Sequence, residues 1–170
     1  MRCVLAALVA GLLLCGPAIA DEPPFEDALL DRLAGEWVLR GMIAGDEWTH
    51  DIAAEWVLGH QYLQIHEISR ETDDAGAPQY EARVFIGWDK PSGRYVCLWL
   101  DSTGGGGLAN DVFGYAEPGE DRIAFVFGVG EGRIHNTFTY HRDEDTWDWS
   151  IDNEREGIRE PFARVVLTRE

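Results

Sequence analysis

The sequence has 170 residues, of which 31 are Asp or Glu and 14 are Lys or Arg, so its formal net charge at pH 7 is −17. A surface this acidic repels the phosphates of nucleic acids and the head groups of anionic lipids, which excludes nucleic-acid binding as a main function. The chain is long enough for one domain with a single sizeable core.

Residues 1–20 have the pattern of a secretion signal. One arginine precedes an apolar run at residues 4–14 that is too short to span a bilayer, and Ala18-Ile19-Ala20 has the small residues of a signal-peptidase site. We expect cleavage before Asp21, which leaves residues 21–170 as one exported domain, periplasmic or secreted, without a membrane anchor. The alternative is that the apolar run is retained as an anchor.

Cys97 is the only cysteine after the predicted cleavage site, so no disulfide can form within the domain. Its neighbours are the apolar residues Val96, Leu98 and Trp99. This setting predicts a buried and unreactive thiol rather than a nucleophile.

Residues 21–33 predict a short helix. The apolar residues recur at helical spacing, and acidic residues occupy the first turn, where the positive end of the helix dipole favours them. The apolar stripe consists of Phe25, Leu29, Leu30 and Leu33. We expect the helix to pack over an open end of a barrel.

From Glu36 onward, apolar and polar residues alternate with the period of two that is typical of β-strands. Turn sequences such as Asp89-Lys90-Pro91-Ser92-Gly93 separate the alternating segments. Strands are expected at residues 36–43, 48–58, 62–68, 80–88, 95–100, 112–116, 123–129, 134–140, 147–151 and 162–168.

About ten short strands without a long crossover predict an all-β fold. We predict an antiparallel up-and-down β-barrel of eight to ten strands with a short N-terminal helix, because closure leaves no exposed sheet edge. A β-sandwich is the alternative. The glycine run at residues 104–107 predicts a mobile loop, and it lacks the lysine of a phosphate-binding loop.

The segment Gly35-Glu36-Trp37, at the junction of helix and first strand, resembles the first-strand motif of lipocalins and their calycin relatives. The resemblance implies that Trp37 closes one end of the barrel against a basic side chain of the last strand. We expect Arg164 to fill that role, since closure places the last strand beside the first, and Arg169 is the less favoured choice.

Residues 85–89 and 97–102 are similar to uncharacterised bacterial lipocalin-like domains. The segment that begins at Gly35 also resembles nitrobindins, which are ten-stranded haem-binding barrels, although Leu39 stands where that family has a glycine. The nitrobindin resemblance implies a late histidine as iron ligand.

The late histidines are His135 and His141. Six residues of strand span about 20 Å, so neither this pair nor the pair His60 and His66 can chelate one metal ion alone. We predict no metal site and no cofactor.

Six residues are candidates for the lining of a ligand cavity: His50, Trp56, Tyr62, Gln64, His66 and Asp101. His50 shares a strand face with Trp48, Ile52 and Trp56, so it points where the apolar side chains point. A buried histidine needs a hydrogen-bond partner, either within the core or in a ligand.

Tyr62, Gln64 and His66 share one strand face, which either lines the cavity or lies on the surface. Asp101 ends an apolar strand beside the glycine run, which places it at the barrel mouth. Its carboxylate could also cap the amides of its own loop.

These residues predict a secreted lipocalin-like domain that binds a small apolar or amphipathic ligand in the barrel. One alternative is an enzyme that uses His50 or His66 as a base, assisted by Asp101. A haem-binding barrel and a filled barrel that acts as an interaction module are further alternatives. The volume of the interior distinguishes a filled barrel from the others, whereas the oligomeric state cannot be predicted.

Overall fold

The computed structural model describes residues 23–104, 113–128 and 132–170. The predicted signal sequence at residues 1–20 and residues 105–107 of the glycine run lie outside the described residues. Within the described part of the chain, no helix is long and apolar enough to cross a bilayer.

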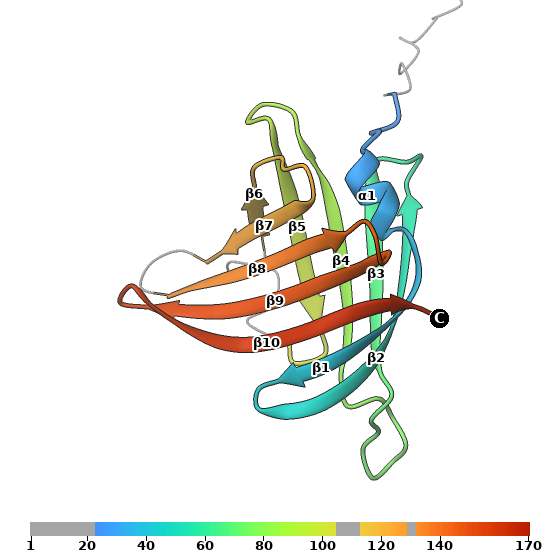
Figure 1. Cartoon of the computed structure of the whole chain (residues 1–170), viewed down its shortest axis with the longest axis vertical. Coiled ribbons are helices and arrows are strands. Elements are labelled where there is room, and N and C mark those ends of the chain that lie inside the picture. Colours follow the sequence, from blue (N-terminus) through green and yellow to red (C-terminus); the bar gives the residue numbers. More distant parts are fainter. Residues whose placement is uncertain (1–22, 105–112, 129–131) are drawn as a thin grey trace, which may run out of the picture.

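Ten antiparallel strands form a closed barrel (Figure 1), in which consecutive strands pair and β1 pairs with β10. This confirms the predicted up-and-down barrel with a short N-terminal helix, and it excludes the sandwich. The elements are α1 (Ala28–Leu33), β1 (Gly35–Ile43), β2 (Asp46–Val57), β3 (Tyr62–Ser69), β4 (Glu81–Asp89), β5 (Arg94–Asp101), β6 (Phe113–Ala116), β7 (Arg122–Phe127), β8 (Gly132–His141), β9 (Thr146–Arg155) and β10 (Ile158–Arg169).

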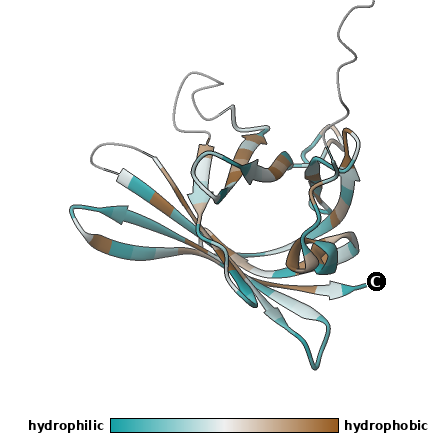
Figure 2. Ribbon diagram, turned by 90° about the horizontal axis from the view of Figure 1, so that it is seen from above, coloured by the Kyte–Doolittle hydropathy of each residue, from teal (hydrophilic) through white to brown (hydrophobic). Residues whose placement is uncertain are grey.

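Apolar residues alternate with polar ones along the strands, as the bands of colour in Figure 2 show. Because successive side chains of a strand point to opposite faces, this alternation sends one set of residues into the barrel. The largest fully buried side chains include Trp37, Leu63, Phe125, Phe138 and Trp147. They form one core with the buried leucines of α1.

The two ends of the barrel differ. At one end α1 covers the opening, near the start of β1 and the turn between β2 and β3 (Figure 1). At the other end the strands are joined by longer connections, among them the loop at residues 70–80 between β3 and β4. We call these the helix end and the loop end.

Asp27 determines where α1 begins and ties it to the barrel wall. One carboxylate oxygen accepts hydrogen bonds from the backbone amides of Leu29 (3.0 Å) and Leu30 (2.8 Å), as expected of a residue that caps a helix. The other oxygen accepts a hydrogen bond from the hydroxyl of Tyr95 on β5 (2.5 Å). The helix is therefore shorter than the predicted span of residues 21–33.

The prediction that Trp37 packs against Arg164 is wrong, because the basic partner is Arg169. The guanidinium carbon of Arg169 lies 3.6 Å from the centroid of the Trp37 ring, opposite it in the β1–β10 register. Arg169 also donates hydrogen bonds to the backbone carbonyl oxygens of Ala34 (3.0 Å) and Arg32 (3.1 Å), so it caps the end of α1. The indole of Trp37 donates to the carbonyl oxygen of Leu33 (2.7 Å).

The alternation along β10 explains the error. Val165 and Leu167 point into the barrel, so Arg169 belongs to the same face, whereas Arg164 points outward. Arg164 forms an ion pair there with Asp152 of β9.

Gly35 permits the close approach of Arg169. A Cβ atom at this position would lie 2.3 Å from a guanidinium nitrogen of Arg169, and the φ angle of +125° is one that L-residues rarely adopt.

Trp37→Ala should lower the free energy of unfolding by about 3–5 kcal/mol, because it opens a void in the core. Arg169→Ala should cost less, and the two losses should not add, because each substitution removes the same contact. We expect a coupling energy of about 0.5–2 kcal/mol, measured by urea unfolding of both single variants and the double variant.

Arg164→Ala is the matched control, since it removes an arginine from the same strand but the opposite face. Its effect should add to that of Trp37→Ala within about 0.5 kcal/mol. Full additivity between Trp37→Ala and Arg169→Ala would contradict the assigned contact.

Cys97 is buried on the inner face of β5, with 1% of its surface exposed. Burial raises the pKa of its thiol, which keeps it protonated and therefore a poor nucleophile. The structure thus agrees with the buried, unreactive thiol that the sequence predicts.

In a chain that begins at Asp21, Cys97 should not react with an aromatic disulfide reagent in mildly alkaline buffer. One equivalent should react once denaturant unfolds the chain, because unfolding both exposes the thiol and restores its ordinary pKa. Rapid reaction of the folded protein, recorded by absorbance, would show that the thiol is accessible.

Candidate ligand-binding cavity

The loop-end half of the barrel encloses a cavity of about 790 Å³. Most of its wall is apolar or aromatic: Leu39, Ile43, Trp48, Tyr80, Trp99, Leu100, Phe127, Ile134, Trp149, Ile151, Phe162 and Val165. Its charged or amide side chains are Asp46, His50, Glu67, Gln79, Asp101, Asn136 and Asn153. A space of this size and character is typical of small-molecule sites, and it argues against a filled barrel.

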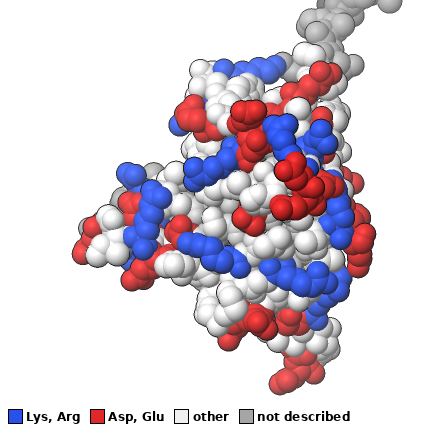
Figure 3. All heavy atoms as spheres, in the orientation of Figure 1, with Lys and Arg blue, Asp and Glu red and all other residues white. Residues whose placement is uncertain are grey.

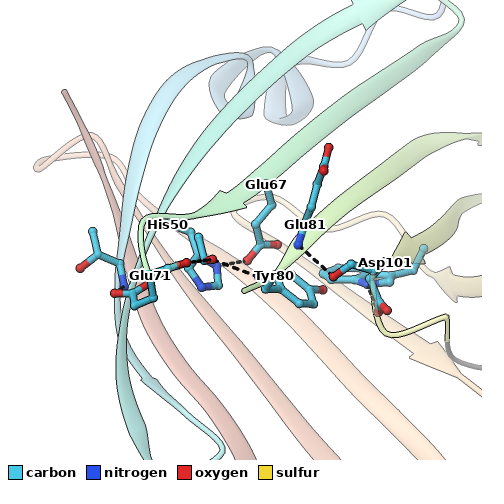
Figure 4. Close-up of polar contacts among 10 residues, drawn as sticks. His50, Glu67, Glu71, Tyr80, Glu81 and Asp101 are labelled. Carbon is cyan, nitrogen blue, oxygen red and sulfur yellow. Dashed lines mark hydrogen bonds and ion pairs between the residues drawn. The ribbon is translucent and has the colours of Figure 1, made fainter. Parts of the chain in front are cut away.

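A histidine–glutamate pair forms the polar part of the wall. Nδ1 of His50 on β2 lies 2.5 Å from a carboxylate oxygen of Glu67 on β3, and the two residues are 2% and 3% exposed. Glu67 stands opposite Ile52, which is two residues from His50, so the pair is diagonal across two neighbouring strands. Figure 4 shows the two side chains pointing toward each other.

The second polar atom of each partner has no hydrogen-bond partner: Nε2 of His50 and Oε2 of Glu67 are both buried and unpaired. Buried polar atoms are nearly always hydrogen-bonded, because losing water without a replacement partner costs free energy. Since His50 and Glu67 line the cavity, a ligand there can supply the missing partners.

Aromatic rings hold the imidazole of His50 in place. It stacks on the ring of Tyr80, with centroids 5.6 Å apart and planes 21° apart, and it meets the ring of Trp48 edge-on at 5.6 Å. Burial, followed by the negative charges of Glu67 and Asp101, raises the pKa of Tyr80. Its hydroxyl therefore stays protonated and neutral.

Asp101 lies at the rim of the cavity and also organises its own loop. One oxygen accepts a hydrogen bond from the indole of Trp99 (3.2 Å). The other accepts from the amide of Thr103 (2.9 Å) and from its hydroxyl. Both roles that the sequence suggests for Asp101, at the mouth and as a loop cap, are therefore present, but no contact joins it to His50 among the described hydrogen bonds.

Asn136 adds a buried amide on the opposite wall, on β8. Its side-chain oxygen accepts a hydrogen bond from the indole of Trp149 (2.5 Å). The ring of Trp149 in turn lies 5.6 Å from that of Trp99, centroid to centroid. These contacts fix two of the aromatic side chains that face the ligand space.

Four of the six predicted lining residues do not line the cavity: Trp56, Tyr62, Gln64 and His66. Trp56 does share the inner-face alternation of β2, but it lies at the helix end, where its indole donates to Asp31 (2.9 Å) and its ring stacks on His60 at 4.1 Å. The prediction for Trp56 thus failed on position along the strand rather than on face.

The polar row of β3 is the outward one. Leu63 is fully buried inside the barrel, so Tyr62, Gln64 and His66 alternate onto the outer surface. There His66 pairs with the exposed Glu81 at 2.7 Å. His66 is therefore not available as a base in the cavity.

Glu67 is the site residue that the sequence analysis missed. A signal was present, because Leu63, Ile65 and Glu67 follow one another at a spacing of two. The two apolar residues identify the inward face of β3, so the acidic residue that continues their row must be buried.

The histidines suggested as haem ligands lie on the outer face of the barrel. Asn136 of β8 is buried inside, so His135 and His141 alternate outward. They pair with Glu154 (2.6 Å) and Asp148 (2.9 Å) of β9. Neither lines the cavity, so these residues do not fit the haem alternative.

Among the described residues, no group of three or more histidine, cysteine or acidic side chains is arranged to hold a metal ion. The sequence matches no known protein family and no curated protein. The cavity itself is therefore the main guide to function.

The His50–Glu67 pair should be important for stability. His50→Leu leaves the carboxylate of Glu67 buried without a partner, which should cost about 3–5 kcal/mol in urea unfolding. Replacing both residues, in His50→Leu/Glu67→Leu, should recover much of that loss because no buried charge remains.

His66→Leu is the matched control, because its glutamate partner on the outer face is 49% exposed and can be hydrated. This substitution should change the free energy of unfolding by less than about 1 kcal/mol. Equal losses for His50→Leu and His66→Leu would contradict the special status of the buried pair.

Proposed function

We propose that the barrel binds a small amphipathic molecule in the loop-end cavity. The observation that carries this proposal is a cavity of about 790 Å³ with an aromatic wall and two buried polar atoms that lack partners, Nε2 of His50 and Oε2 of Glu67. The apolar body of the ligand would pack against the aromatic wall, and its polar group would bond to the pair. Area removed from water would supply most of the affinity, and the pair would orient the ligand.

Export is part of the proposal. The pattern of residues 1–20 supports a secretion signal, with residues 21–170 acting as a secreted lipocalin-like domain in the periplasm or the medium. In this setting the protein would carry or sequester its ligand outside the cytoplasm. The likeness of the Gly35-Glu36-Trp37 segment to lipocalins supports the same function.

The same pair supports a second candidate, an enzyme with His50 as general base. A carboxylate on Nδ1 orients the imidazole and stabilises its protonated form, so Nε2 could take a proton from a bound substrate. Glu67 replaces Asp101 as the assisting carboxylate in this version of the hypothesis.

Binding can be tested with N-phenylnaphthylamine, a neutral probe whose fluorescence rises in apolar surroundings. The unmodified protein should enhance its emission, and Val165→Trp should abolish the enhancement, because Val165 is 5% exposed and lines the cavity. Val166→Trp is the matched control, since the adjacent residue points outward and is 41% exposed. Circular dichroism checks that both variants fold, and equal enhancement by both variants would rule out the cavity as the binding site.

Native mass spectrometry of protein purified from its own host distinguishes the two candidate functions. Carriage of a ligand predicts that His50→Gln protein co-purifies with the same molecule at lower occupancy. Catalysis predicts that His50→Gln protein retains a different molecule, the unconverted substrate. Absence of any small molecule from the unmodified protein in repeated preparations would count against tight binding of an endogenous ligand.

A further inference from the structure

The charges around the cavity have one sign. Its lining contains the carboxylates Asp46, Glu67 and Asp101, and no lysine or arginine is present among the described residues that line it. The lining therefore carries negative charge whether His50 is neutral or protonated. The arginines visible in Figure 3 lie on the outside of the barrel, interleaved with acidic side chains.

The two unpaired atoms of the pair also favour one type of ligand group. When the Glu67 carboxylate is ionised, Nδ1 of His50 must carry the hydrogen of the 2.5 Å contact. Nε2 of the neutral imidazole is then an acceptor, as is Oε2 of Glu67, so both unpaired atoms require a donor. If His50 is protonated, Oε2 still requires one.

The aromatic wall next to the pair favours a cation over a neutral donor. Tyr80 and Trp48 flank the imidazole of His50, and a ring face attracts a positive charge held against it. A neutral hydroxyl would satisfy one acceptor, whereas an ammonium group can donate to both and also offset the buried charge of Glu67. A carboxylate on the ligand would be repelled.

We propose that the ligand of this barrel is an amphipathic organic cation, with an ammonium group bound at Glu67 and His50 and an apolar body against the aromatic wall. This inference rests on the proposed binding function and adds the chemical class of the ligand. The cation would neutralise a carboxylate that is 3% exposed and has one oxygen without a partner.

The test compares three probes that share one alkyl chain and differ only in the polar group: decylammonium, decanol and decanoate. Each displaces N-phenylnaphthylamine from the full chain below its micelle concentration. We expect decylammonium to bind roughly tenfold or more tightly than decanol, because a hydrogen bond to an ionised partner is about twice as strong as a neutral one, and decanoate to bind weakest.

Two glutamate substitutions locate the source of the preference. Glu67→Gln keeps the size of the side chain but removes its charge, so the advantage of decylammonium over decanol should disappear while decanol still binds. Glu81→Gln is the matched control on the outer surface and should leave the advantage intact, because Glu81 does not line the cavity. If Glu67→Gln fails to fold, the ranking of the three probes on the unmodified protein still decides.

The outcomes separate the two proposals. If N-phenylnaphthylamine itself does not bind, the proposed binding function fails. If it binds but decanol or decanoate equals decylammonium, or if no alkyl probe displaces it, the function stands and the cationic ligand is overturned. A preference for decylammonium that survives in Glu67→Gln protein also overturns the inference, because the charge would then be recognised elsewhere.

Discussion

Closure of the barrel depends on the contact between Trp37 at the start of β1 and Arg169 at the end of β10. A single guanidinium covers the indole ring, reaches two carbonyl oxygens at the end of α1 and pairs with Asp145 in the β8–β9 turn. The contact therefore joins the first strand, the last strand, the helix and a neighbouring turn. Because it excludes water from the helix end, the core beneath it can be packed as tightly as an ordinary protein interior.

Tight packing at the helix end leaves the loop end free for another use. The barrel does not need to fill its whole interior to be stable, since the fully buried aromatic and aliphatic side chains near α1 already form a continuous core. The cavity begins where that core ends, and the His50–Glu67 pair lies in its wall. Two ionisable groups without water are tolerated there because each satisfies one atom of the other.

Much of the fold could be predicted from the sequence because strand alternation is a local signal. The barrel, the short helix and the inward direction of His50 all follow from a period of two and from turn residues. The partner of Trp37 was harder, since the correct arginine depends on the register between two strands at opposite ends of the chain. Counting outward from Val165 and Leu167 would have favoured Arg169, because residues of equal parity share a face.

The cavity residues were predictable only in part. Alternation tells which face a residue occupies, but not whether the space before it is filled, and Trp56 shows the difference: it has the inward parity yet packs beside α1. Neither the volume of the cavity nor the pairing of His50 with Glu67 can be read from spacing, because both depend on how ten strands curve together. The outward row of β3 was undecided in the sequence for the same reason.

The seven tryptophans are divided between the two halves of the barrel. Trp48, Trp99 and Trp149 border the cavity, whereas Trp37, Trp56, Trp88 and Trp147 do not. The rings of Trp99 and Trp149 are close enough, at 5.6 Å between centroids, for their electronic transitions to couple. The protein thus carries its own optical reporter: a molecule that entered the cavity would disturb this coupled pair, while the indoles outside the cavity provide a constant background signal.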